Sequence, residues 1–160
     1  MISVIGSGDG ETVDFGGLGV RFMVTGEGFA LVEHPIAPRT LAAPMHVHER
    51  EDEYSYVLEG EVGVQVGDEV RYVRAGELAV KPRGIWHAFW NRADEPARIL
   101  EIISPAGFEE YFAKLDALLR PEVLEREALA ALQASYGLTM DMSSVGVICA
   151  REGLPLPPGF

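Results

Sequence analysis

The sequence is poor in cysteine and in basic residues, and both shortages limit what the protein can be. Cys149 is the only cysteine among 160 residues, so an internal disulfide is excluded. There are 13 lysine and arginine residues against 25 aspartate and glutamate residues, which gives a formal net charge of −12. No basic cluster is available to contact phosphates, so nucleic acid and anionic membrane surfaces are disfavoured as partners. Cys149 has no neighbours at metal-ligand spacing, and we expect a free, buried thiol rather than a nucleophile.

Long apolar segments are also missing. No run of about 18 apolar residues could cross a bilayer. The first residues include Asp9, Glu11 and Asp14 in place of a basic start and an apolar stretch of signal-peptide length. We therefore expect a cytoplasmic protein. With 160 residues and 48% hydrophobic content, the chain is long enough for one buried core, and two cores would be crowded.

Short apolar runs punctuated by glycine or proline recur about every ten residues along most of the chain. Val20–Thr25 and Phe29–Ile36 flank Gly26-Glu27-Gly28 and predict a hairpin. Further strands are predicted at residues 54–58, 62–66, 70–73, 78–81, 85–91 and 97–103. This spacing is typical of an antiparallel sandwich or barrel and not of parallel βαβ units. Residues 1–19 hold six of the eighteen glycines and predict an irregular arm or an edge strand.

Three of the four histidines and one glutamate have a spacing that favours a single metal ion. His46 and His48 are two residues apart, so in a β-strand both imidazoles point to the same face. The next strand would bring Glu53 alongside them, and His87 follows in a later segment. Three imidazoles and one carboxylate form a transition-metal site with nitrogen and oxygen donors.

The segment just before these ligands contains the fourth histidine and several prolines. His34 has no partner at ligand spacing, and we interpret it as an ordinary strand histidine. Pro35, Pro38 and Pro44 interrupt the approach to the His46 strand, and they predict a loop there.

The spacing around the four proposed ligands resembles the two sequence motifs of the cupin family. In the first motif Thr40 stands where the leading glycine usually is, and the remaining positions are filled by His46, His48, Glu53 and Gly60. The second motif is matched in full by Gly76, Pro82, Gly84, His87 and Asn91. The glycines and the proline are interpreted as turn residues, and the asparagine as a structural hydrogen-bonding residue. The resemblance covers roughly residues 20–105 and implies an all-β fold, the double-stranded β-helix or cupin jelly-roll barrel.

Strand alternation also predicts what surrounds the metal. If Glu53 faces inward, Val57 shares its face, and by the same count Ile85 and Phe89 share the face of His87. Val57, Ile85 and Phe89 are therefore the candidate residues of a substrate pocket. A mostly apolar chamber suits a flat aromatic or otherwise hydrophobic ligand. The alternative is that these side chains simply fill a small barrel.

Aromatic residues are predicted on the outer face of the barrel as well, at Tyr54, Tyr56, Trp86 and Trp90. Such residues either pack against a second layer or mark a subunit interface. Because cupins are often dimers, the resemblance implies a homodimer.

The apolar period changes after residue 107. Residues 108–119 have apolar side chains at helical spacing, and Pro121 ends this helix. Residues 122–136 predict a second, alanine-rich helix that Gly137 stops. We predict a barrel with an N-terminal arm at residues 1–107 and a helical extension and tail at 108–160 that packs on it. The tail from residue 137 onward matches no pattern, and it either covers the barrel mouth or docks on a partner subunit.

Within the cupins, the chain resembles quercetin 2,3-dioxygenase-like proteins. The likeness rests on the unbroken His-x-His-x4-Glu motif, on residues 82–91, and on Ile103-Ser104-Pro105-Ala106-Gly107-Phe108 before a helix. It implies a dioxygenase that acts on a small aromatic or hydrophobic oxygenated substrate, with one divalent Fe, Ni, Mn, Co or Zn ion held by His46, His48, Glu53 and His87.

The resemblance gives Glu53 two alternative roles, as a permanent ligand or as a catalytic base that leaves the metal to accept a proton. Two other classes of function compete with the dioxygenase. One is a non-oxidative isomerase, cyclase or lyase in which the metal polarises a carbonyl. The other is a non-catalytic protein that binds small molecules.

Overall fold

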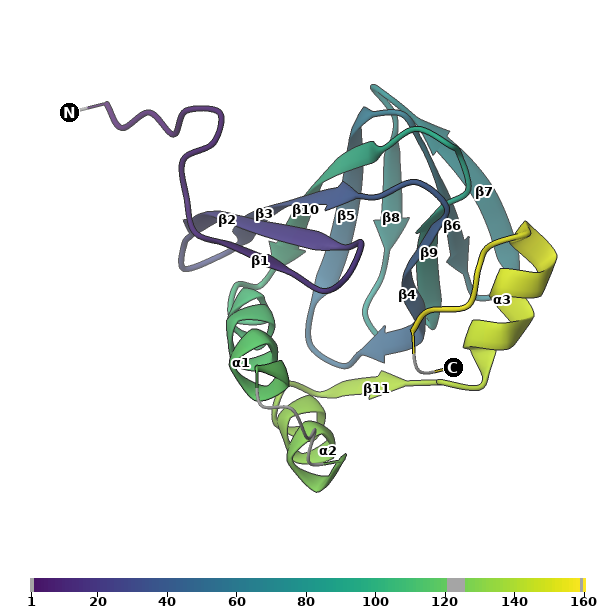
Figure 1. The fold of residues 1–160 in the computed structure, drawn as a ribbon. Helices are drawn as coiled ribbons and strands as arrows, with labels where there is room; N and C mark the ends of the chain where they lie inside the picture. Colours follow the sequence, from purple (N-terminus) through teal and green to yellow (C-terminus); the bar gives the residue numbers. More distant parts are fainter. Residues whose placement is uncertain (1, 121–125, 159) are drawn as a thin grey trace.

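The computed structural model describes residues 2–120, 126–158 and 160, and its main feature is a pair of facing β-sheets with two helices below them and a third helix at the side (Figure 1). The strands of the first sheet are β1 (Thr12–Asp14), β2 (Gly19–Thr25), β3 (Ala30–Ile36), β10 (Ala97–Ser104), β5 (Asp52–Glu59) and β8 (Leu78–Lys81), in that spatial order. The second sheet has the order β11 (Leu138–Met140), β4 (Thr40–His48), β9 (His87–Asn91), β6 (Glu61–Val66) and β7 (Glu69–Arg74). The helices are α1 (Glu109–Leu119), α2 (Arg126–Ser135) and α3 (Ser144–Glu152).

The pairing of these strands confirms the predicted fold class. Neighbouring strands in both sheets run antiparallel, and pairs such as β3 with β10 and β4 with β9 join segments far apart in the sequence. This is the arrangement of a double-stranded β-helix, with α1 and α2 of the C-terminal helical part below the barrel and α3 beside it in Figure 1. Among the described residues, no helix is both long enough and apolar enough to cross a membrane.

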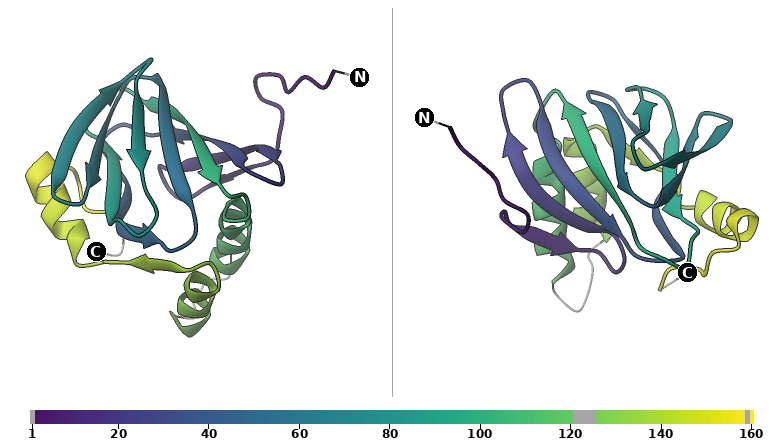
Figure 2. Two further views of the ribbon diagram at one scale, coloured as in Figure 1. Left: turned by 180° about the vertical axis from the view of Figure 1, so that it is seen from behind. Right: turned by 90° about the horizontal axis from the view of Figure 1, so that it is seen from above.

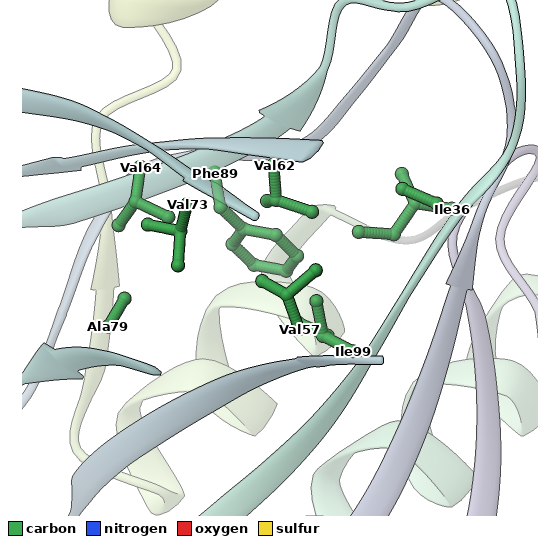
Figure 3. Packing of buried hydrophobic residues seen from close by; sticks show 9 residues of the cluster. Ile36, Val57, Val62, Val64, Val73, Ala79, Phe89 and Ile99 are labelled. Atoms are coloured by element: carbon green, nitrogen blue, oxygen red, sulfur yellow. The ribbon is translucent and has the colours of Figure 1, made fainter. Parts of the chain in front are cut away.

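Apolar side chains from both sheets pack together in one part of the space between them. Phe89 of β9 packs against Val57, Val62 and Ile99, as Figure 3 shows. At the end of the same strand, the buried Asn91 donates hydrogen bonds from Nδ2 to the carbonyl oxygens of Ile36, Ala37 and Glu95. The prediction of a structural role for this asparagine is confirmed.

The loop predicted from the three prolines is largely wrong. Pro35 lies within β3 and Pro44 within β4, and Pro38 is in the turn between the two strands. Strand β4 tolerates a residue without an N–H group because its register with β9 shifts twice, between Leu41 and Ala43 and between Ala43 and His46. Irregular positions of this kind are where proline is accepted in a sheet.

The C-terminal segment returns to the barrel twice. The two predicted helices are present as α1 and α2, although Pro121 and residues 122–125 lie outside the described residues. Strand β11 then pairs with β4, so that Leu138 is opposite His48. Helix α3 lies beside the barrel (Figure 2), where it contacts β4. Val145 and Ile148 of this helix belong to the same buried cluster as Trp90.

Candidate metal centre and adjoining cavity

The proposed ligands are brought together by three strands of the barrel. His46 and His48 are at the end of β4, Glu53 is the second residue of β5, and His87 opens β9. Antiparallel pairing of β4 with β9 places His46 directly opposite His87. The short turn between β4 and β5 folds Glu53 back beside the two histidines, as the sequence predicts.

The four side chains form a compact, buried cluster. Their potential ligand atoms all lie within 4.8 Å of one another. The ring centroids of His46 and His87 are 4.2 Å apart, and His48 lies 5.2 Å from the first and 5.5 Å from the second. Nε2 of His87 is 3.1 Å from Oε2 of Glu53, and Nε2 of His48 is 3.5 Å from Oε1. One ion of the size and donor preference of a divalent transition metal fits such a set of three nitrogens and one carboxylate.

Backbone carbonyls set the orientation of two imidazoles. Nδ1 of His46 is 2.8 Å from the oxygen of Pro44, and Nδ1 of His87 is 2.9 Å from that of Ile85. A carbonyl oxygen can only accept a hydrogen bond, so each Nδ1 bears a proton, which leaves Nε2 as the nitrogen that carries the lone pair when the ring is neutral. Outer partners of this kind are usual for metal-bound histidines. The two rings therefore present the nitrogen that a metal requires.

The third imidazole has a looser outer partner. Nδ1 of His48 is buried without a hydrogen bond and lies 3.8 Å from Oε2 of Glu51, which is also buried and unpaired. A small movement would let His48 donate to Glu51, and this would direct Nε2 toward the other ligands. Phe108 packs edge-on against the ring of His48, with centroids 4.2 Å apart, and limits its other movements.

Burial keeps His46 and His48 neutral, which is the form of an imidazole that binds metal. Loss of solvation lowers the pKa of His48 to about 4 and the pKa of His46 well below its usual value, where His87 and His48 add to the effect. Burial has the opposite influence on Glu53, but the charge of Lys81 and the neighbouring His48 and His87 outweigh it and hold the pKa of that carboxyl well below its usual range. The two histidines of β4 are therefore neutral beside an ionised carboxylate.

Lys81 and Glu101 are parts of this site that the sequence reasoning missed. Lys81 is 1% exposed, and its Nζ lies 3.0 Å from Oε2 of Glu53 and 3.0 Å from Oε2 of Glu101. Ser55 also donates a hydrogen bond of 2.8 Å to Oε2 of Glu101. The available signal was strand alternation, because Lys81 pairs with the inward-facing Glu53 and Glu101 pairs with the inward-facing Ser55.

A cavity of about 280 Å³ adjoins the cluster. Its polar side includes His46, His48, Glu53, Lys81 and Glu101. The rest of its wall is mostly apolar and comes from the N-terminal arm, β4, β9, α1, α2 and β11, with Phe15, Ala43, Phe89, Phe112, Leu129 and Met140 as examples. The chamber is therefore mostly apolar next to the proposed metal site, and it is not filled completely by side chains.

The three candidate pocket residues have different positions in the structure. Phe89 lines the cavity. Val57 shares the inward face of Glu53 but lies four residues further along β5, where it is packed into the core beneath Phe89. Ile85 is 43% exposed. It lies in the turn before β9, which begins at His87, so the alternation of side chains in a strand does not apply to it. The assignments of Val57 and Ile85 to the pocket are therefore corrected.

The interpretation of His34 as an ordinary strand histidine also needs correction. His34 of β3 lines the cavity, although it does not belong to the four-residue cluster. The spacing of metal ligands along the sequence identifies only residues that bind the same ion. It gives no signal for His34, which faces the same chamber from β3.

Outward-facing aromatic residues are divided between two environments. Trp90 is fully buried, because α3 forms the second layer over it. Tyr56 is 39% exposed and Trp86 is 38% exposed. Cys149 lies on the inner face of α3 as a free, buried thiol, as predicted. The homodimer stays a prediction.

Comparisons with known proteins agree with this architecture. Residues 33–103 match the Cupin domain family. Over 61 residues the chain is 44% identical to the tetracenomycin polyketide synthase protein TcmJ of Streptomyces glaucescens. That match covers 38% of this chain and 40% of the other, so it spans about two fifths of the curated relative.

Solved structures show the same fold. KdgF from Halomonas sp. has a TM-score of 0.63 and 19% identity, over 69% of this chain and 99% of that chain. TT1209 from Thermus thermophilus has a TM-score of 0.53 and 30% identity, over 56% of this chain and 84% of that chain. The chain therefore carries a match to the Cupin domain family at residues 33–103 and shares the fold of these solved structures.

Proposed function

We propose that this cupin is a metal-dependent enzyme that acts on a small aromatic or polycarbonyl compound without consuming dioxygen. The observation that carries the proposal is a four-ligand cluster that opens directly into a mostly apolar cavity of about 280 Å³. The similarity to the polyketide synthase protein TcmJ supports a polyketide-like compound, rich in carbonyl and hydroxyl groups, as the substrate class.

His46, His48, His87 and Glu53 would hold a divalent transition metal in this enzyme. When bound, the metal would supply Lewis acidity toward a substrate carbonyl or phenol oxygen. The mostly apolar wall of the cavity offers water few hydrogen-bonding partners, and a substrate that displaces water there would strengthen the electrostatic interactions inside it. Phe89 and Phe112 offer flat surfaces against which an aromatic ring packs favourably.

Glu53 is better suited to permanent ligation than to proton transfer. A catalytic base must leave the metal and take up a proton, and it works best with a pKa near the working pH. Lys81 holds Oε2 of Glu53 at 3.0 Å and helps to keep the pKa of the carboxyl well below its usual value. This ion pair weighs against the base role on which the quercetinase-like hypothesis partly rests.

A dioxygenase is the second candidate. The specific observation in its favour is the donor set, because three imidazoles and one carboxylate also bind iron, nickel, manganese or cobalt. The adjoining cavity would shelter a reactive substrate. In this case Glu53 acts as a ligand throughout, and dioxygen is a co-substrate.

The test compares reactions with and without oxygen. Protein loaded separately with Fe²⁺, Ni²⁺, Mn²⁺, Co²⁺ or Zn²⁺ is incubated with a polyketide mimic that contains several 1,3-diketone units. Products are analysed by mass spectrometry, and oxygen uptake is recorded. We expect a product of unchanged composition, or one that has lost only water, at the same rate in both conditions.

Two variants serve as controls. His87→Ala removes a ligand and should abolish both metal content and turnover, whereas Ile85→Ala lies outside the cavity and should leave both unchanged. Oxygen uptake coupled to loss of the substrate would favour the dioxygenase. A mimic that binds to the metal-loaded protein and is recovered intact in both conditions would indicate a binding protein.

A further inference from the structure

His34 is a buried histidine that the metal centre does not use. It belongs to β3, is 2% exposed, and lies opposite Ile99 of β10. Its ring is held between two aromatic residues of the cavity wall, with centroids 5.4 Å from Phe112 and 6.3 Å from Phe89. The imidazole therefore faces the chamber from a different strand than the ligands do.

The protonation of His34 follows from its contacts. Nδ1 lies 2.9 Å from the carbonyl oxygen of Gly19, which can only accept, so Nδ1 bears a proton. Burial lowers the pKa of His34 to about 4, despite the raising influence of the Gly19 hydrogen bond, so the ring is neutral at pH 7. In this tautomer Nε2 has a lone pair and acts as a hydrogen-bond acceptor.

That acceptor has no protein partner in the described part of the chain. No described residue forms a hydrogen bond with Nε2 of His34. The unpaired side-chain atoms that have no accessible surface do not include this nitrogen, so Nε2 is accessible. Since the residue is almost fully buried and lines the cavity, the open side of Nε2 is the cavity itself. Buried polar groups normally have a partner, so this one indicates a ligand group or an ordered water.

The register of the sheet separates His34 from the metal ligands. The row that contains His34 and Ile99 continues to Val57, which is four residues from Glu53 along β5. Four residues of a strand span about 13 Å between backbone positions. His34 therefore faces the chamber from a different level of the sheet than Glu53, and a ligand that contacts both carries two separate polar groups, as a fused-ring aromatic compound with two oxygens does.

We propose that Nε2 of His34 accepts a hydrogen bond from a hydroxyl group of the substrate that is remote from the oxygen bound at the metal centre. The inference deepens the proposed function, on which it rests. It assigns the substrate to fused-ring aromatic compounds with a metal-binding oxygen at one end and a phenol or enol hydroxyl toward the other. A neutral hydrogen bond of this kind corresponds to about a 2- to 13-fold change in affinity.

The test uses two kinds of probe with zinc-loaded protein. One is a hydroxyanthraquinone with a single hydroxyl beside a carbonyl, and the others are analogues with a second hydroxyl on the far ring. Dissociation constants are measured by absorbance titration. In the wild-type protein we expect at least one dihydroxy isomer to bind about 2- to 13-fold more tightly than the monohydroxy probe.

The informative variant is His34→Asn. An asparagine amide can replace Nδ1 as the donor to Gly19, but it has no atom at the position of Nε2. We expect unchanged zinc content and loss of the preference for the dihydroxy isomer. Leu115→Ala, which alters another part of the cavity wall, should change the affinity for both probes by a similar factor and is the matched control.

A nuclear magnetic resonance measurement on the wild-type protein keeps the proposal testable if His34→Asn does not fold. The ¹⁵N signal of Nε2 should shift when the preferred dihydroxy isomer is added and not when the monohydroxy probe is added. Probes that bind with the same ratio of affinities in wild-type and His34→Asn protein, or a silent Nε2 signal, overturn the role of His34 alone. Zinc-loaded wild-type protein that binds no hydroxyanthraquinone overturns the proposed function together with this inference.

Discussion

Replacing Lys81 by methionine tests whether this lysine balances the charge of the centre. Lys81 is 1% exposed and lies 3.0 Å from carboxylate oxygens of both Glu53 and Glu101. Methionine has a similar length and keeps most of the apolar contacts of the lysine side chain, but it leaves two buried carboxylates without their shared cation. Breaking a buried pair in this way costs about 3–5 kcal/mol. In a chain of 160 residues this corresponds to a fall in Tm of about 6–20 °C.

The assay is thermal and urea unfolding of metal-free and zinc-loaded protein. Since a bound cation would itself offset the charge of Glu53, we expect zinc to raise the Tm of Lys81→Met by more than it raises that of the wild type. The double variant Lys81→Met/Glu101→Gln should regain part of the lost stability, because it removes the second uncompensated carboxylate while Ser55 remains a hydrogen-bond partner. Glu101→Gln alone is the matched control. A metal-free Lys81→Met protein within about 1 kcal/mol of the wild type would refute the reasoning.

Three further predictions address packing, pH and metal binding. Gly63→Ala places a Cβ 2.1 Å from Nε1 of Trp90 and should destabilise the fold in urea unfolding by about 1–3 kcal/mol or more, whereas Gly146→Ala, with nothing within 4 Å, should not. Metal-free protein should lose stability as the pH falls from 6.5 to about 4, because the unfolded chain binds more protons there than native His34 does. Native His34 accounts for up to about 1.4 kcal/mol of the free energy of unfolding per pH unit in this range. If the free energy of unfolding falls with pH equally in wild-type and His34→Asn protein, the argument is contradicted. Zinc at 100 times its Kd should stabilise the wild type by about 2.7 kcal/mol and leave His87→Ala unaffected, as thermal scans would show.

The barrel and the metal cluster could be predicted from sequence because both depend on local spacing. Short strands bounded by glycine and proline indicate an antiparallel all-β fold, and a His-x-His pair on one strand must present both rings to one face. The turn residues support the same interpretation: Gly76 and Gly84 have φ angles of 89° and 74°, which favour glycine. Each of these signals is contained within a few consecutive residues, and the resemblance to the two cupin motifs joined His87 of β9 to the ligands of β4 and β5.

The remaining parts of the site depend on contacts between distant strands. Lys81 and Glu101 look like surface charges until the register shows that they face Glu53 and Ser55. Alternation alone placed Val57 in the pocket, but depth along the strand decides whether an inward side chain meets the chamber or the core. The three-residue strand β11 is too short to produce a recognisable pattern.

Strand β11 has a consequence for how the chain can be divided. Without residues 138–140, β4 would be the outermost strand of its sheet and would expose unpaired backbone groups along the segment that contains His46 and His48. Exposed strand edges of this kind pair with other chains and promote aggregation. A shortened protein that stops after β10 would therefore be prone to self-association at β4, the strand that supplies two ligands. The C-terminal third thus both encloses the centre and keeps other chains from pairing with β4.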